Sequence, residues 1–142
     1  MGDCLFCGIL AGEVGSSIVC RDELSCDFLD IQPINPGHVL VIPTRHASNL
    51  AELDEESGGR LLQVAQRVAR ALRMGSSDLR CEGVNFFLAD GVAAGQAVFH
   101  VHLHVIPRFE GDGFGLRFGP DYGTRPGRDE LDAIAGQLRE RV

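Results

Sequence analysis

Three histidines alternate with aliphatic residues at positions 100, 102 and 104 of the chain. Successive side chains of a β-strand point to opposite faces, so His100, His102 and His104 are predicted to line one strand face, roughly 6.5–7 Å apart. The aliphatic residues between them would then face a hydrophobic core. Imidazole titrates near neutral pH and serves as a nucleophile and a metal ligand. The pattern therefore predicts a reaction centre or a metal site.

The loop before these histidines, residues 90–96, is rich in small residues. Gly91 and Gly95 let the backbone approach a ligand closely and present N–H groups to an anion. Joined to three histidines, this loop indicates a phosphate-handling site. His102 could attack phosphorus to form a covalent phospho-imidazole if one ring nitrogen is unprotonated and the other donates to an acceptor. The histidines on either side could orient substrate or stabilise charge on phosphate oxygens.

Cys4 and Cys7 form a C-x-x-C pair, whose spacing can place two thiolates on one Zn²⁺. The same spacing is typical of a redox pair, and two small buried thiols are a further interpretation. Because no second C-x-x-C exists, histidines would have to complete a metal site, and His46 and His100 are the candidates. The other cysteines have no metal spacing and are interpreted as core or chance residues: Cys20, Cys26 and Cys81.

The composition of the chain, with 44% hydrophobic and 23% charged residues, is ordinary for a globular protein. We expect residues 1–142 to form a single domain. The net charge of −7 argues against binding to nucleic acid. No apolar run reaches the roughly 18–20 residues that span a bilayer, and no signal peptide is recognised, so a cytoplasmic location without membrane association is expected. Five cysteines, an odd number, make a disulfide framework improbable there.

Hydrophobic periodicity predicts one long helix over residues 54–73, with Asp54 as its N-cap and Gly75 as its stop. A second helix is expected at residues 129–141, and residues 4–12 are interpreted as a turn or a single helical turn. Strands are predicted at residues 17–22, 24–30, 38–42, 84–89 and 100–105. Two hairpin-like strand pairs around a helix favour a largely antiparallel α+β domain.

Four segments together resemble the histidine triad (HIT) superfamily, and most closely its bacterial zinc-containing branch. They are "CLFCGILAGE", "FLDIQPINPGHVLVIPTRH", "GQAVFHVHLHVIPR" and "GDGFG", in that order between about residues 3 and 115. The resemblance implies an α+β HIT-like fold, with a five-stranded mainly antiparallel sheet, one long central helix and a C-terminal helix. It also implies a homodimer.

The resemblance further implies a nucleotide hydrolase or nucleotidyl transferase. Its substrate would be a purine nucleoside monophosphate conjugate, either a phosphoramidate or a dinucleoside polyphosphate. His102 corresponds to the nucleophile, which forms a nucleotidyl-histidine that water then resolves without a metal ion. His104 would contact the phosphate or the leaving group, and His38 would support the other histidines by hydrogen bonding.

The resemblance also implies the binding residues. Asp30 would hold the ribose hydroxyls, Ile31 would contact the base beside Phe28, and Gly95 and Gln96 would contact the phosphate. The implied ligands of one structural zinc ion per chain are Cys4, Cys7, His46 and His100.

Two departures from the family pattern bear on the rate. Ala89 replaces a common Asn or Gln, and Ala97 replaces a common Ser or Thr. A missing hydrogen bond to a charged oxygen costs about 1.5–3 kcal/mol, which would slow catalysis roughly ten- to hundredfold. One alternative is therefore a nucleotide-binding or sensor module with weak or no catalysis. Another is a metallohydrolase whose three histidines bind a catalytic metal.

Overall fold

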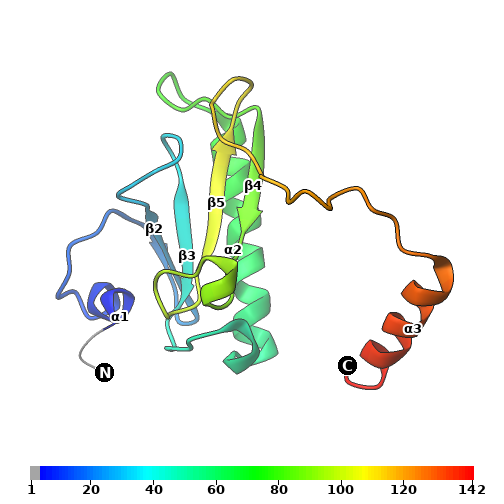
Figure 1. The fold of residues 1–142 in the computed structure, drawn as a ribbon. Coiled ribbons are helices and arrows are strands. Elements are labelled where there is room, and N and C mark those ends of the chain that lie inside the picture. Colours follow the sequence, from blue (N-terminus) through cyan, green and yellow to red (C-terminus); the bar gives the residue numbers. More distant parts are fainter. Residues whose placement is uncertain (1–3) are drawn as a thin grey trace.

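The computed structural model describes residues 4–142 (Figure 1). Within this range five antiparallel strands form one open sheet in the order β1-β2-β3-β5-β4. The strands are β1 (Ile18–Arg21), β2 (Ser25–Leu29), β3 (Val39–Pro43), β4 (Gly83–Phe87) and β5 (Leu103–Arg108). The helices are α1 (Leu5–Leu10), α2 (Glu55–Met74) and α3 (Arg128–Arg139), with short 3-10 turns η1 (Leu50–Glu52) and η2 (Val92–Ala94). The expected α+β architecture is confirmed.

The long helix α2 begins and ends where its local signals predict. The Asp54 carboxylate accepts the Ser57 backbone N–H at 2.9 Å, and Gly75 ends the helix with a φ of 70°. Its apolar face packs against one face of the sheet. The buried helix residues of this core are Leu61, Val64, Ala65, Val68, Ala69 and Leu72.

The opposite face of the sheet carries a second apolar cluster, and α1 packs there (Figure 1). Its buried members are Phe6, Ile9, Cys26, Phe28, Leu40 and Ile42. Strand β3 lies between the two clusters and is buried along its whole length, as expected for a central strand. Because Leu40 and His104 are directly opposed in the register, the histidine lies on this second face.

The predicted strand over residues 100–105 is wrong in its first half, because β5 begins only at Leu103. The neighbouring strand β3 ends at Pro43, which has no N–H to continue the ladder. The Val101 N–H instead donates to the Ala47 carbonyl at 2.9 Å. The aliphatic residues still alternate into the α2-facing core, as predicted.

The strand predicted over residues 84–89 also ends early, since β4 stops at Phe87. Phe87 pairs with His104, so Ala89 would need a partner that precedes the start of β5. Ala89 is buried but lies outside the ladder.

The C-terminal helix α3 forms close to the predicted residues 129–141, from Arg128 to Arg139, but lies away from the body of the molecule. Residues 113–127 lead from the sheet to α3 (Figure 1), and none of the α3 residues is buried. Within residues 4–142 no helix is long and apolar enough to cross a membrane.

Candidate active site and metal cluster

A turn before β3 positions His38, the residue immediately before this strand. Gly37 has a φ of +94°, and a Cβ atom there would lie 2.9 Å from Leu72 Cδ2, so the position requires glycine. His38 is 2% exposed. Its Nδ1 accepts the Ile34 backbone N–H at 3.1 Å, and its Nε2 lies 2.9 Å from His104 Nδ1.

These contacts assign the protons of both rings. Since Nδ1 of His38 accepts a hydrogen bond, its Nε2 carries the proton and donates to Nδ1 of His104. The remaining proton of His104 is therefore on Nε2. Burial lowers the pKa of His38, and burial together with the neighbouring His102 and His38 lowers the pKa of His104 to about 4. His104 is thus a neutral N–H donor at physiological pH.

His102 has the opposite arrangement. Its Nδ1 lies 2.8 Å from the His100 carbonyl oxygen, to which it donates. Nε2 therefore keeps its lone pair. The ring centroid lies 5.0 Å from that of His104 and 5.2 Å from that of Phe6, both in edge-on geometry. An imidazole held in this tautomer can act as a nucleophile through Nε2.

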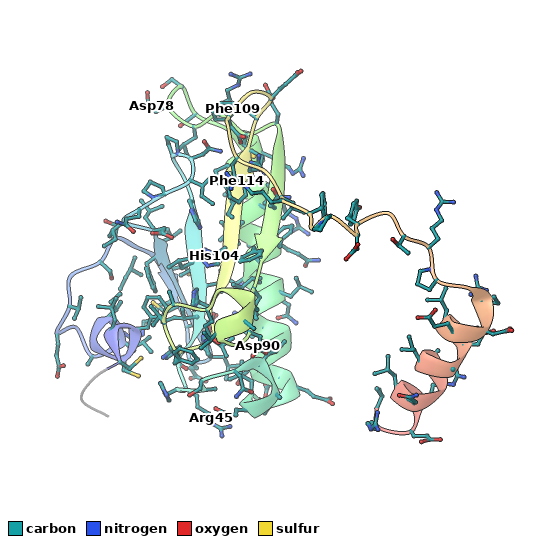
Figure 2. The ribbon with its side chains drawn as sticks, viewed as in Figure 1. Arg45, Asp78, Asp90, His104, Phe109 and Phe114 are labelled. Carbon is teal, nitrogen blue, oxygen red and sulfur yellow. The ribbon has the colours of Figure 1, made fainter. Side chains whose placement is uncertain are left out.

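A pocket of about 320 Å³ opens beside these rings on the face of the sheet opposite α2. It is lined by five of the predicted nucleotide-binding residues, which are Phe28, Asp30, Ile31, His102 and His104. Figure 2 shows His104 on β5, near the middle of the sheet. Mostly apolar walls with a few convergent polar groups are typical of a small-ligand site.

Gly95 and Gln96 do not line this pocket. The Gln96 side chain accepts the Gly91 N–H at 2.7 Å and donates to the carbonyls of Ser48 and Val98. The Gly95 N–H donates to a carbonyl within its own turn. The Gln96 side chain therefore holds the loop, and the phosphate contacts of Gly95 and Gln96 that the resemblance implies stay a prediction.

The two alanine departures lie in different environments. Ala89 is buried and does not line the pocket, whereas Ala97 is exposed and does. The Asp90 carboxylate accepts the Leu50 N–H at 3.2 Å, which ties it to η1. Of the two departures, only Ala97 lies on the pocket wall, where it replaces a side chain that is commonly polar in the family pattern.

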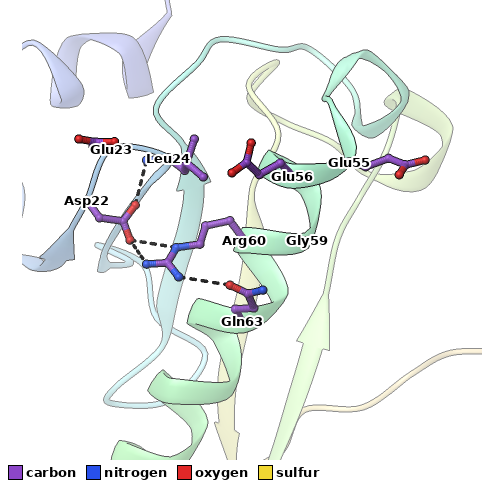
Figure 3. Close-up of a pocket in the computed structure, with 8 residues that line it drawn as sticks. All are labelled: Asp22, Glu23, Leu24, Glu55, Glu56, Gly59, Arg60 and Gln63. Atoms are coloured by element: carbon purple, nitrogen blue, oxygen red, sulfur yellow. Dashed lines mark hydrogen bonds and ion pairs between the residues drawn. The ribbon is translucent and has the colours of Figure 1, made fainter.

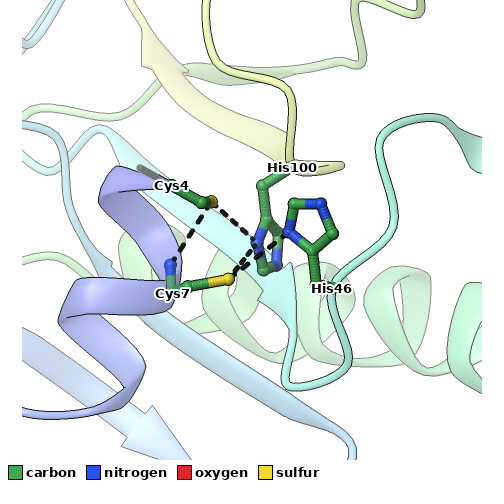
Figure 4. A group of neighbouring side chains, drawn as sticks. All are labelled: Cys4, Cys7, His46 and His100. Carbon is green, nitrogen blue, oxygen red and sulfur yellow. Dashed lines mark hydrogen bonds between the residues drawn. The ribbon is translucent and has the colours of Figure 1, made fainter. Parts of the chain in front are cut away.

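The predicted zinc ligands come together at the start of α1 (Figure 4). The Sγ atoms of Cys4 and Cys7 lie 3.4 and 3.6 Å from His100 Nδ1, and Cys7 Sγ lies 3.3 Å from His46 Nδ1. Four tetrahedral ligands at usual zinc distances place sulfur and nitrogen about 3.5 Å apart. The cluster therefore fits a tetrahedral Cys₂His₂ zinc site.

The surroundings of His100 also suit a metal ligand. The ring is 0% exposed, and its Nε2 donates to the Pro43 carbonyl at 2.9 Å. Nδ1 thus presents its lone pair to the thiols, and a carbonyl bonded to the other ring nitrogen is typical of metal-binding histidines. Burial lowers the pKa of His100, which keeps the ring neutral.

A larger pocket of about 490 Å³ lies between the β1–β2 turn and α2 (Figure 3). Its one guanidinium, on Arg60, is bound by Asp22 and donates to Gln63. Arg60 lowers the pKa of Asp22 to about 2, so this pair is charged at neutral pH. Three further carboxylates line the pocket: Glu23, Glu55 and Glu56. An excess of negative charge makes this pocket unsuited to a nucleotide.

Sequence reasoning missed the contribution of α1 to the nucleotide pocket. Leu5, Phe6 and Ile9 all line it. The available signal was the apolar pair Leu5-Phe6 between the two cysteines of the C-x-x-C motif.

A sequence model of the HIT domain matches residues 11–111. The chain belongs to the HIT family. An uncharacterized HIT-like protein from Borreliella burgdorferi is 44% identical over 119 residues, covering 84% of this HIT protein and 85% of the relative. Adenosine 5'-monophosphoramidase hnt1 from Schizosaccharomyces pombe is 34% identical over 140 residues and 98% of each chain.

A solved structure also resembles this HIT protein. The zinc-bound histidine triad family protein from Mycobacterium smegmatis has a TM-score of 0.75 and 38% identity. The match covers 99% of this chain and 98% of the other. The recognition of the HIT superfamily from four sequence segments is therefore confirmed.

Proposed function

We propose that this HIT protein cleaves purine nucleoside monophosphate conjugates through a covalent nucleotidyl-histidine on His102. The observation that carries the proposal is the tautomer of His102, whose Nδ1–H is bound to a backbone carbonyl at 2.8 Å. Its free Nε2 belongs to a ring that lines the pocket together with His104. The activity of the monophosphoramidase relative supports a phosphoramidate as one substrate.

In this proposal the nucleoside occupies the apolar end of the pocket. The base lies against Phe28 and Ile31, and the carboxylate of Asp30 accepts hydrogen bonds from the ribose hydroxyls. Ile31 is 90% exposed, so it offers a large apolar surface that the base can cover. His104 donates from Nε2 to a phosphate oxygen, and His38 holds His104 in the required tautomer.

The proposed hydrolysis needs only the nucleotide conjugate and water. The Nε2 lone pair of His102 forms a bond to the α-phosphorus, and the bond from phosphorus to the leaving group breaks with its electrons on the leaving group. The His100 carbonyl stabilises the resulting cationic ring through the Nδ1–H. Water then attacks phosphorus, and the bond from phosphorus to His102 Nε2 breaks with its electrons returning to the ring. The hydroxyl stays on the nucleoside monophosphate, and the proton that the water releases replaces the one that the leaving group takes up from solvent.

Cys4, Cys7, His46 and His100 would hold one zinc ion per chain in a structural role. When bound, zinc supplies a rigid link between α1 and the first of the three histidines. The proposed step uses the Nε2 atoms of His102 and His104 and draws on no metal. A catalytic metal shared by His38 and His104 is disfavoured, because the Nε2 of His38 carries the proton it donates.

A turnover panel tests the proposed activity. We expect adenosine 5'-phosphoramidate and a dinucleoside polyphosphate to release AMP, with an acid-labile adenylate on the protein after rapid quenching. Metal-stripped protein assayed at saturating substrate should still form the adduct, whereas a metallohydrolase would form none.

A nucleotide sensor is the second candidate, because Ala97 stands on the pocket wall at a position where the family commonly has a hydroxyl. It would bind AMP tightly, turn over none of the panel and form no adduct. That result would show that the protein binds nucleotides without cleaving them.

We also propose a homodimer in which β4, residues 113–127 and α3 contact a second copy of the chain. Strand β4 is at the edge of the sheet, and an edge with exposed apolar side chains favours pairing. A helix as short as α3 is marginal in water without a partner. The large exposed apolar and aromatic residues of β4, of residues 113–127 and of α3 are Phe86, Phe87, Phe114, Leu116, Phe118, Tyr122, Leu131, Ile134 and Leu138.

Light scattering after size exclusion tests the dimer, with an expected mass of twice the 15.3 kDa chain. Phe86→Glu should yield monomer. Met74→Glu is the matched control, since this residue is 86% exposed at the end of α2 and belongs neither to β4 nor to the C-terminal segment. A monomeric wild type, or equal dissociation of both variants, would contradict the proposed interface.

A further inference from the structure

Helix α1 belongs to two sites at once. Its N-terminal part provides Cys4, as N-cap, and Cys7 to the metal cluster. The same helix provides Leu5, Phe6 and Ile9 to the wall of the nucleotide pocket. One six-residue element therefore separates the predicted zinc ion from the predicted nucleotide.

The position of α1 depends on few attachments. A helix of six residues does not persist alone in water. Phe6 and Ile9 anchor it in the second apolar cluster, and Arg21 donates to the Leu10 carbonyl at 2.8 Å. The metal cluster adds long-range links from Cys4 and Cys7 to ligands on other segments. Loss of the metal would remove a large share of what holds this wall in place.

Phe6 provides a direct contact between the two sites. Its ring centroid lies 5.9 Å from that of His100, the buried metal ligand, and 5.2 Å from that of His102, the proposed nucleophile. Both contacts are edge-on. The His100 carbonyl also accepts the Nδ1–H of His102. A displaced α1 would therefore alter both the wall of the pocket and the packing of the nucleophile.

We propose that zinc binding and nucleotide binding are thermodynamically coupled through α1, with Phe6 as the positioning residue between the two sites. This inference rests on the proposed function, because it requires a nucleoside monophosphate in the pocket. Zinc fixes α1 against His100 and completes the pocket wall. Nucleotide packed against that wall in turn holds the two thiols near their partners. Coupling of two binding equilibria is reciprocal, so each ligand must raise the affinity for the other by the same factor.

Calorimetry with AMP on zinc-loaded and chelator-stripped wild-type protein measures the coupling. We expect the Kd for AMP to rise at least about tenfold without zinc, which corresponds to about 1.4 kcal/mol. Competition with a chromogenic zinc chelator should show the same factor in the Kd for zinc when AMP is left out. Amide hydrogen exchange over residues 5–11 should speed up in the stripped protein while α2 stays protected.

Three variants keep the test independent of misfolding. His46→Gln removes one exposed ligand and should weaken both affinities while circular dichroism stays unchanged. Phe6→Leu keeps an apolar side chain but should reduce the coupling factor towards one, which a purely structural role would not do. Cys20→Ser, an exposed cysteine outside the cluster, should behave as wild type.

The outcomes separate the two proposals. Equal AMP affinity with and without zinc overturns the coupling and leaves the proposed function intact. Zinc-loaded protein that fails to bind AMP overturns both. Unchanged coupling in Phe6→Leu removes Phe6 from the argument.

Discussion

Replacing His102 by alanine is expected to lower kcat for adenosine 5'-phosphoramidate by at least about 10³-fold, the scale seen when a covalent nucleophile is removed. The reason is specific to this ring: its Nε2 is the unprotonated imidazole nitrogen, held by the Nδ1–H bond to the His100 carbonyl. The variant should still bind AMP, because His102 is only one of the residues that line the pocket and the apolar wall around the base comes from others. Steady-state rates, together with adduct trapping from a substrate labelled at the α-phosphate, measure the effect.

His104→Asn is the matched comparison for this result. Asparagine keeps an N–H donor but cannot continue the hydrogen bond from His38 in the same way, so a smaller loss of roughly 10–100-fold is expected. Rapid-quench adducts should persist in this variant and be absent from His102→Ala. Comparable turnover in wild type and His102→Ala would exclude the covalent mechanism.

Parts of the fold were predictable because their signals are local. Asp54, the apolar spacing along α2 and Gly75 lie within one segment, and the helix follows them. The uniformly apolar β3 likewise reads as a central strand from its own residues. Such features need no knowledge of distant partners.

The histidine run shows where local reasoning ends. The alternation of histidines and aliphatic residues correctly predicted that the aliphatic side chains face the core. It did not predict which of these residues pair with a neighbouring strand. Pairing stops at Leu103 because the partner strand ends in Pro43, more than fifty residues earlier in the chain. The three histidines consequently have different partners: the thiols for His100, a backbone carbonyl for His102 and His38 for His104.

The loop at residues 90–96 was harder still to predict. Its composition indicates flexibility, yet Gln96 is fixed by a bond to the Ser48 carbonyl, far away in sequence. The contribution of Phe6 to the pocket depends in the same way on the docking of α1. Only the assembled structure distinguishes a residue that holds a loop from one that contacts a ligand.

A buried acid outside both sites should control stability against pH. Asp27 on β2 is 2% exposed and lies opposite Val41, a member of the α2-facing core. Among residues 4–142 no ion pair involves it. Burial, together with the charge of Asp22, raises the pKa of Asp27 to about 6.

The sign of the effect follows from the raised pKa. The folded state holds the Asp27 proton more tightly than the unfolded state, so this proton stabilises the fold at low pH and its contribution disappears as pH rises through about 6. The full contribution is about 3 kcal/mol below the unfolded pKa and about 1.5 kcal/mol at pH 5. Asp27→Asn lacks this proton equilibrium. The free energy of unfolding of Asp27→Asn minus that of wild type should therefore be about 1.5 kcal/mol higher at pH 7.5 than at pH 5, so the variant gains stability relative to wild type as pH rises.

Urea denaturation of both proteins at the two pH values measures this difference, and comparing the changes with pH cancels groups that titrate equally in both, including His104. Asp78→Asn is the control, because this carboxylate is exposed in the loop after α2 (Figure 2) and its replacement should show no such pH-dependent change. If Asp27→Asn shows no larger pH-dependent change than Asp78→Asn, the pKa of Asp27 is not raised in the folded state. A stabilised Asp27→Asn at pH 7.5 would show instead that this HIT protein retains an acid in its core that the proposed chemistry does not use.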